Sequence, residues 1–207
     1  MSLKILRDVS FFVLLHRLDL DLAGLARDQG CAICGGRLHS ARYPRQLRGV
    51  LEKIAARFGK RESFCCAEDG CRRRTTPPSV IFFGRRCYQA AMVVLVSALA
   101  HGASERRLGR LTGLFGIDRR TLLRWQSFWL EAFPESEFMR AEGGRFSPSL
   151  CRRRLLRDLL SRFVGASRDR LLSALLFLSP LSTGSVANEH ARQWALKTRR
   201  GGVVIAF

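Results

Sequence analysis

Clustered cysteines are the residues of this sequence whose type and spacing most clearly indicate chemistry. Five of the seven cysteines lie between residues 31 and 71. Cys31 and Cys34 form a C-x2-C pair followed by two glycines, and farther along Cys66 and Cys71 form a C-x4-C pair. Such turns can direct backbone N–H groups at the sulfurs, and four thiolates at tetrahedral corners suit Zn²⁺. We therefore predict a structural zinc site with Cys31, Cys34, Cys66 and Cys71 as its ligands.

The adjacent cysteines of FCCAEDGC, residues 64–71, leave a choice of ligand. Neighbouring side chains on an extended chain point to opposite sides, so Cys65 and Cys66 are not expected to share one metal ion. Cys66 gives the usual knuckle spacing to Cys71, whereas Cys65 would need five intervening residues. We predict that Cys66 is the ligand and that Cys65 packs beside Phe64. An iron–sulfur cluster also accepts four cysteines, but no flavin or redox motif accompanies them, and free cysteines are the plainer alternative.

The net charge indicates which class of molecule the protein binds. The 207 residues carry 36 lysines and arginines against 17 aspartates and glutamates, a formal net charge of +19 with a pI of about 11.3. Codon bias can exchange lysine for arginine, but it does not remove acidic residues. Because a surface this positive attracts polyanions, we predict duplex DNA as the partner. A zinc-ribbon RNA-binding protein is the alternative.

Apolar runs in the sequence are short. The run FFVLL, residues 11–15, is too short for a secretory signal, and AAMVVLVSALA, residues 90–100, is too short to span a bilayer. We predict a cytoplasmic, nucleoid-associated protein with no membrane partner. In that compartment thiols stay reduced, which favours metal binding over disulfides.

A second pattern, SERRLGRLTGLFGIDRRTLLRW at residues 104–125, predicts two helices joined by a tight turn. Ser104 and Asp118 are suited to cap the helices, and Gly116 falls in the turn between them. Apolar residues recur at the spacing that packs two crossing helices together: Leu108, Leu111, Phe115, Ile117, Leu122 and Trp125. The pattern predicts a helix-turn-helix, with residues 90–100 as a supporting helix. A helical hairpin with a solvated basic face is the plainer alternative.

The second helix of a helix-turn-helix enters the major groove, which selects the residues expected to contact DNA. Outward positions of that helix are Arg119, Arg120, Leu123, Arg124 and Ser127. Arginine can hold guanine through two hydrogen bonds, and leucine can contact a thymine methyl group. Basic residues of the first helix and of the segment after the last clustered cysteine are expected to bind phosphates: Arg106, Arg107, Arg110, Arg72, Arg73 and Arg74.

Along the chain, these patterns predict a mainly α fold with a small zinc ribbon, in which a helix-turn-helix bundle follows a four-cysteine zinc-binding module. We place an N-terminal helical segment at 1–30, the zinc-ribbon-like module at 31–78 and the helix-turn-helix domain at 79–134. Residues 135–207 form a basic helical C-terminal region. It begins with an expected linker at 135–149, and from Pro180 on it is expected to be a loose tail.

The order of these motifs resembles the N-terminal part of bacterial insertion-sequence transposases. There, a zinc ribbon ending in a Cys-Arg-Arg-like run precedes a helix-turn-helix and then an RNase-H-like catalytic domain. The resemblance covers residues 31–133, with Cys71, Arg72 and Arg73 ending the ribbon. It implies a DNA-binding protein of a mobile element: a transposase-related accessory or regulatory protein, or a truncated transposase. It also implies a separate transposase or recombinase as a further partner.

The sequence departs from that family in its catalytic half. The family's catalytic domain places three carboxylates on two metal ions. Here the acids after Phe133 include Asp158 and Asp169, which lie among arginines on expected helices. We therefore predict no catalytic residues, and a short transposase or nuclease stays the enzymatic alternative.

Overall fold

The computed structural model describes residues 3–47, 49–83, 87–88 and 104–183. The expected helix at 90–100 and the tail from residue 184 onward lie outside the described residues. The elements, in chain order, are η1 (Leu3–Arg7), α1 (Val9–Asp28), β1 (Leu38–Ser40), β2 (Tyr43–Pro44), α2 (Glu52–Phe58), β3 (Lys60–Arg61), β4 (Phe64–Cys66), β5 (Arg74–Thr75), β6 (Phe82–Phe83), β7 (Cys87–Tyr88), α4 (Glu105–Phe115), α5 (Arg119–Ser127), the π-helical turn η2 (Phe128–Ala132), α6 (Glu137–Glu142), η3 (Gly143–Arg145), η4 (Arg152–Arg154), α7 (Leu155–Ser161), α8 (Ser167–Leu178) and η5 (Ser179–Ser182).

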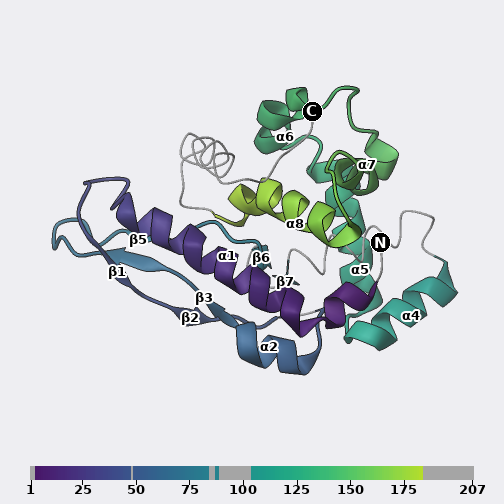
Figure 1. The fold of residues 1–207 in the computed structure, drawn as a ribbon, viewed down its shortest axis with the longest axis horizontal. Coiled ribbons are helices and arrows are strands. Elements are labelled where there is room, and N and C mark those ends of the chain that lie inside the picture. Colours follow the sequence, from purple (N-terminus) through teal and green to yellow (C-terminus); the bar gives the residue numbers. More distant parts are fainter. Residues whose placement is uncertain (1–2, 48, 84–86, 89–103, 184–207) are drawn as a thin grey trace.

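The fold is mainly α with a small sheet, as the sequence predicts (Figure 1). None of the helices in the described ranges has the length and apolarity that crossing a membrane requires.

Helix α1 connects the two ends of the molecule (Figure 1). Asp8 caps its first turn, because the carboxylate accepts a hydrogen bond of 2.9 Å from the backbone N–H of Ser10. Apolar side chains at helical spacing bury one face, among them Phe11 and Leu15. Gly30 follows the helix with a φ of 75°, the left-handed conformation that commonly ends helices. The C-terminal half of α1 lies over the strands, and the N-terminal half of α1 lies near α4 and α5.

A three-stranded antiparallel sheet in the order β1-β4-β5 forms the end of the molecule opposite α4 (Figure 1). Across its strands Leu38 pairs with Cys66, and Cys65 pairs with His39 on one side and Arg74 on the other. Strands β2 and β3 form a separate antiparallel pair. We call residues 31–75, which hold this sheet and the clustered cysteines, the four-cysteine module.

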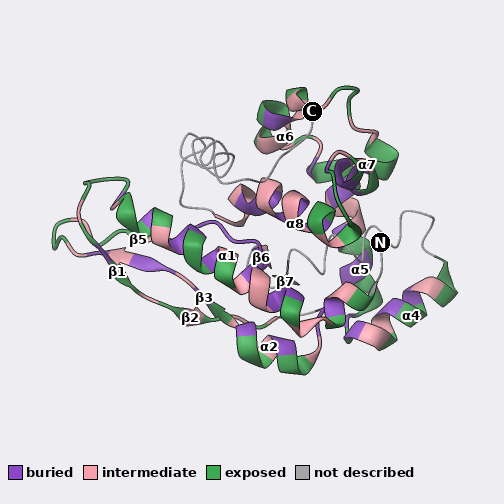
Figure 2. Cartoon of the chain, viewed as in Figure 1, coloured by how far each residue is buried: buried purple, intermediate pink, exposed green. Residues whose placement is uncertain are grey.

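One large buried apolar cluster extends from Leu6 in η1 to Leu178 in α8. Figure 2 shows buried residues on helices from both ends of the chain, such as α1 and α8. It includes Ile54 of α2, Trp129 of η2 and Leu159 of α7. The cluster therefore takes residues from all four segments that the sequence delimits, and their boundaries stay a prediction.

The segment 135–149 is packed against this core, and its prediction as a linker is wrong. Helix α6 lies within it, and the ring of Phe138 is 6.1 Å from that of Phe133 and 5.1 Å from that of Phe177. Glu142 is buried and forms an ion pair of 2.8 Å with Arg145. The glycines and the proline of the segment suggested a loop, but its apolar side chains anchor it to the core.

A buried polar network joins α1 to three segments that follow it in the chain: β3, residues 79–80 and η5. The Asp19 carboxylate accepts hydrogen bonds from the Ser79 hydroxyl at 2.5 Å and from the Val80 N–H at 2.6 Å. The Ser182 hydroxyl accepts from the Ser79 N–H at 2.8 Å and from the buried guanidinium of Arg61 at 3.3 Å. Burial raises the pKa of Asp19 to about 6. Nothing in the sequence pattern indicated this network.

Candidate functional site

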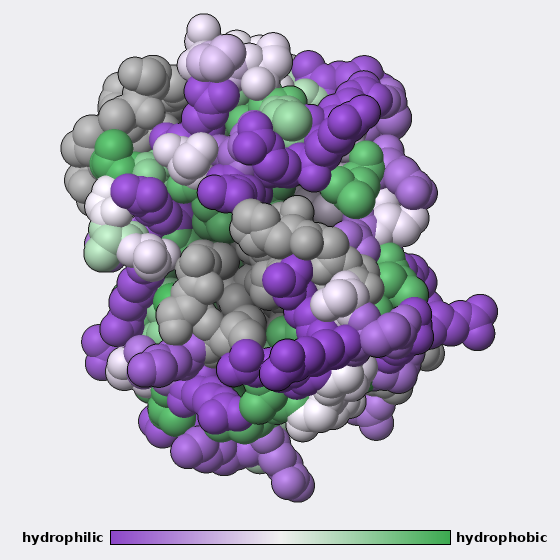
Figure 3. All heavy atoms as spheres, turned by 90° about the vertical axis from the view of Figure 1, so that its right-hand side faces the viewer, coloured by the Kyte–Doolittle hydropathy of each residue, from purple (hydrophilic) through white to green (hydrophobic). Residues whose placement is uncertain are grey.

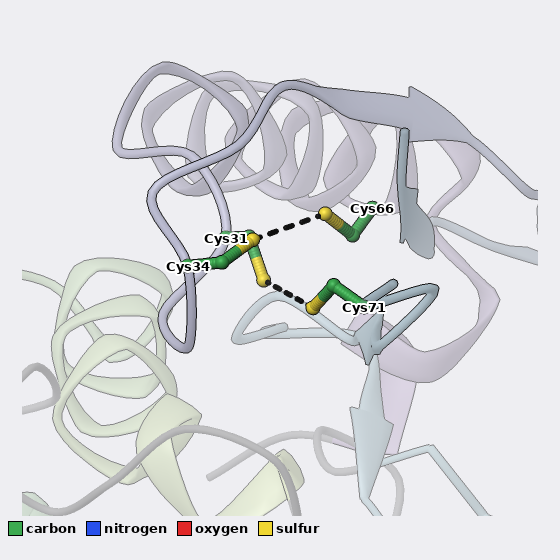
Figure 4. Close-up of side chains that lie close together, drawn as sticks. All are labelled: Cys31, Cys34, Cys66 and Cys71. Carbon is green, nitrogen blue, oxygen red and sulfur yellow. Dashed lines mark hydrogen bonds between the residues drawn. The ribbon is translucent and has the colours of Figure 1, made fainter. Parts of the chain in front are cut away.

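Cys31, Cys34, Cys66 and Cys71 converge between the loop after α1 and the sheet (Figure 4). Their sulfurs all lie within 4.8 Å of one another, with Cys31 Sγ 3.7 Å from Cys71 Sγ and Cys34 Sγ 3.5 Å from Cys66 Sγ. A regular tetrahedron with Zn–S bonds of about 2.3 Å has sulfur–sulfur edges of about 3.8 Å. The four thiols could therefore hold one metal ion, and zinc as that metal stays a prediction.

Backbone amides surround the sulfurs in a repeating pattern. Each sulfur accepts a hydrogen bond from the N–H two residues farther on: Ile33 to Cys31, Gly36 to Cys34, Glu68 to Cys66 and Arg73 to Cys71. The N–H groups of Ile33 and Cys34 lower the pKa of the Cys31 thiol to about 6. Donors directed at sulfur stabilise the thiolate, which is the form that binds metal. At Cys34, Cys66 and Cys71 the amides also act in this direction, but burial and the neighbouring sulfurs outweigh them and raise the pKa of these thiols.

The two cysteine turns have the same backbone design. The Cys31 N–H donates to the Gly36 carbonyl at 2.8 Å, and the Cys66 N–H donates to the Arg73 carbonyl at 2.9 Å. In each turn the residue after the second cysteine is left-handed: Gly35 has φ 71° and Arg72 has φ 43°. Glycine adopts this conformation without strain, whereas arginine does not. The second turn therefore keeps the geometry of the first at a conformational cost.

Gly36 leaves no room for a side chain beside the sulfurs. A Cβ atom there would lie 2.5 Å from Glu68 Cγ and 3.2 Å from both Cys34 Sγ and Cys66 Sγ. Gly36, the second glycine after the C-x2-C pair, thus permits close approach of the two turns.

Cys65 lies outside the cluster, on the opposite face of β4 from Cys66. Phe64 and Cys66 are buried and Cys65 between them is half-exposed. Its thiol donates to the Arg72 carbonyl at 3.5 Å. The alternation expected from the sequence therefore holds, although packing of Cys65 beside Phe64 does not follow, because the two side chains point to opposite faces. His39, opposite Cys65 in the register, is likewise outside the cluster.

A small apolar cluster supports the four sulfurs. Cys31 and Cys66 are buried in it, and Cys34 is exposed. The other buried members come from the end of α1, β1 and β4: Ala23, Ala26, Leu38 and Phe64. So few apolar side chains contribute little hydrophobic stabilisation, and a metal ion would supply what they do not.

Helices α4 and α5 form at the second pattern that the sequence singled out. Gly116, with φ 59°, ends α4, and the Asp118 carboxylate caps α5 by accepting a 2.8 Å hydrogen bond from the Thr121 N–H. Ser104 precedes α4 as expected, but its side chain makes no capping bond. The six apolar residues that define the pattern are all buried: Leu108, Leu111, Phe115, Ile117, Leu122 and Trp125.

Most of the predicted DNA contacts on this helix pair reach solvent. Arg106, Arg110, Arg119, Arg120, Leu123 and Arg124 are exposed, and Arg107 and Ser127 are half-buried. Arg119 donates to Glu105 at 2.7 Å, and the Ser127 hydroxyl donates to Glu131 at 2.6 Å. Figure 3, which views the molecule from this end, shows a largely hydrophilic face.

Arg72, Arg73 and Arg74 are exposed at the other end of the molecule. Arg72 forms an ion pair with Asp69. The predicted phosphate contacts therefore divide into two groups near opposite ends of α1, a separation that the sequence alone did not give.

Comparisons with protein-family models, with curated proteins and with solved structures found no match for this chain.

Proposed function

We propose that this chain is a zinc-dependent DNA-binding protein in which α4 and α5 act as a helix-turn-helix. The observation that carries the proposal is the exposed side of α5, where Arg120, Leu123 and Arg124 lie together on a helix fixed from behind by Leu122 and Trp125. Residues three and four apart share one face of a helix. The formal net charge of +19 supports a polyanionic partner.

In the proposed complex α5 lies in the major groove. Arg120 and Arg124 each hold a guanine through two hydrogen bonds, and Leu123 contacts a thymine methyl group. Arg106 and Arg110 of α4 bind backbone phosphates, which set the orientation of α5 without reading sequence. Arg119 has to leave Glu105 before it can contact DNA, so its contribution is smaller than that of Arg120.

Zinc has a structural role in this proposal. Cys31, Cys34, Cys66 and Cys71 fill the four positions of a tetrahedral ion, which leaves none for a substrate. The ion fixes the strands and thereby the arginines of β5 and the turn before it. Arg73 and Arg74 then present rigidly held guanidinium groups to phosphates.

A role in a mobile genetic element is the more specific part of the proposal. It is supported by the order of the motifs, a four-cysteine module followed by a basic helix pair, as in the N-terminal part of insertion-sequence transposases. We propose an accessory or regulatory protein related to transposases, or a truncated transposase. In the described part of the C-terminal region two carboxylates serve the fold: Asp158 accepts from the Cys151 N–H at 2.9 Å, and Asp169 accepts from the Ala166 N–H at 3.1 Å.

Selection of binding sites from random duplexes tests the proposal, followed by affinity measurements over a range of salt concentrations. Arg120→Ala/Arg124→Ala is expected to weaken binding to the selected site by about 2–6 kcal/mol and to relax its sequence preference. Arg17→Ala/Lys53→Ala removes the same charge from exposed positions of α1 and α2 and is the matched control. Equal affinities of the two double variants would contradict the role of α5, and preference for structured RNA over every duplex would favour the RNA-binding alternative.

A further inference from the structure

A groove at the edge of the four-cysteine module is used neither by the cysteine cluster nor by the helix pair. It is lined by Arg27 and Asp28 from the end of α1 and by residues 37–40, which include β1. Of the lining side chains Leu38 is buried, and the others are exposed. In the described part of the chain no ion pair engages Arg27 or Arg37. We call this site the Arg27–Arg37 groove.

The backbone of β1 adds hydrogen-bond donors to the groove. Strand β1 is at the edge of the sheet, with β4 on one side only. The Arg37 carbonyl and the Ala41 N–H both form 2.8 Å hydrogen bonds with residues that flank β4. Because backbone groups alternate between the two sides of a strand, the N–H groups of Leu38 and Ser40 point toward the free edge.

We propose that the Arg27–Arg37 groove binds a backbone phosphate of nucleic acid, an inference that rests on the proposed DNA-binding function. Two guanidinium groups, the edge N–H groups and the Ser40 hydroxyl are the donors that phosphate oxygens accept from. These donors carry no pattern that distinguishes bases, so the groove contributes affinity and position but not sequence preference. The proposal gives α1 a direct part in binding.

Asp28 gives a second prediction, in which loss of a charge tightens binding instead of weakening it. Its carboxylate lines the same groove and repels a phosphate there. It also lies at the C-terminal end of α1, where a negative charge is unfavourable for the helix. Asp28→Asn is therefore expected to tighten binding without harming the fold, so a gain in affinity cannot be mistaken for unfolding.

The test uses the full-length chain loaded with zinc and a duplex whose binding is measured over a range of salt concentrations. Arg27→Ala/Arg37→Ala is expected to bind about 10-fold more weakly, with a salt dependence shallower by about 1–2 units of log Kd per log salt. Asp28→Asn is expected to bind up to about 5-fold more tightly. Arg17→Ala/Lys53→Ala, which loses the same charge elsewhere, is the control. Duplexes with single neutral methylphosphonate linkages then locate the phosphate. Replacing the phosphate that the groove contacts should weaken binding by the unmodified protein but not by the Arg27→Ala/Arg37→Ala variant.

The outcomes separate this inference from the proposed function. If α5 variants weaken binding while the groove variants behave like the control, the groove inference is overturned and the proposed function stands. If the groove variants change sequence preference instead of salt dependence, the assignment to a phosphate is wrong. If the zinc-loaded chain binds no duplex even at low salt, both are overturned.

Discussion

The four-cysteine module and the α4–α5 pair hold basic side chains in place by different means. Within the module α2 packs into the main core, but the cysteine end has only a small apolar cluster, and its geometry depends on two turns whose amides converge on four sulfurs. The helix pair instead inserts six apolar residues into or against the main core, and a left-handed glycine and an aspartate cap fix its turn. The cysteine end of the module is therefore expected to depend on metal, and the helix pair on packing.

Removing one ligand gives the largest expected difference between the two regions. Metal binding contributes on the order of 10 kcal/mol to the folding of small zinc modules. Cys66→Ser leaves only three thiolates, so most of this contribution is expected to be lost. We expect the sheet to unfold while α4 and α5 remain protected in amide hydrogen exchange. Zinc stoichiometry and exchange rates measure the two effects.

Cys65→Ser is the matched control for that substitution. Its thiol lies on the other face of β4, so zinc content is expected to stay unchanged. Zinc release by Cys65→Ser and retention by Cys66→Ser would reverse the ligand assignment.

Truncation of a core side chain should affect the helix pair and spare the metal site. Leu111→Ala deletes a side chain that is 2% exposed and is expected to lower the free energy of unfolding by about 2–5 kcal/mol. Leu123→Ala, at a position 37% exposed, should cost far less. Denaturant unfolding measures both variants, and the folded protein should bind zinc as before. A loss of zinc in folded Leu111→Ala would show that the two regions are not separately supported.

Asp19 tests how the module is attached to α1 and to the segment that follows it, since its network contains Arg61 of β3 and Ser79 after the module. Its folded pKa is raised to about 6 from 3.8. The folded state therefore binds the proton more tightly than the unfolded state. The resulting stability is fully present below about pH 3.8 and is lost as pH rises through about 6.

Comparison with Asp19→Asn isolates the contribution of Asp19 protonation to the free energy of unfolding. Asparagine does not titrate, and zinc loss in acid affects both proteins. The free energy of unfolding of the unmodified protein relative to the variant is expected to fall by about 1–2 kcal/mol between pH 5 and pH 8. Denaturant titrations at four pH values suffice. A difference that stays constant with pH would remove Asp19 as the titrating group.

The smallest expected effect is a gain in stability within the module. Arg72 holds the left-handed conformation that Gly35 holds in the other turn, so Arg72→Gly should stabilise the zinc-bound protein by about 0.5–1 kcal/mol. Its exposed ion pair with Asp69 contributes little against this. Arg74→Gly, on the extended backbone of β5, should destabilise instead. Thermal unfolding distinguishes them, and equal shifts would show that backbone strain at Arg72 is negligible.

Local patterns predicted the converging thiols of the module and the two helices of the α4–α5 pair. Cysteine spacing selected the four thiols that converge, and the alternation of a strand separated Cys66 from Cys65. Apolar periodicity with Gly116 and Asp118 gave α4, its turn and α5. In each case the signal lies within a few residues along the chain, where backbone geometry alone fixes which side chains share a face.

The sequence could not predict contacts between distant segments. The prediction of a linker at 135–149 rested on the glycines and the proline of that segment. The ring packing of Phe138 against Phe177, which holds the segment to the core, cannot be read from the sequence. The Asp19 network and the Arg27–Arg37 groove join residues far apart in the chain, and no spacing rule identifies such partners.

Residue types and their spacing therefore specify the chemical groups that this protein carries: four thiols, a basic helix after a capped turn, and a large positive charge. The positions of these groups relative to one another follow from the packing of distant segments. That packing placed the two basic groups near opposite ends of α1, engaged Arg119 with Glu105, and opened a donor-lined groove at the edge of β1. The physical reason is that element formation depends on neighbours in sequence, whereas the arrangement of surfaces depends on which apolar faces bury one another.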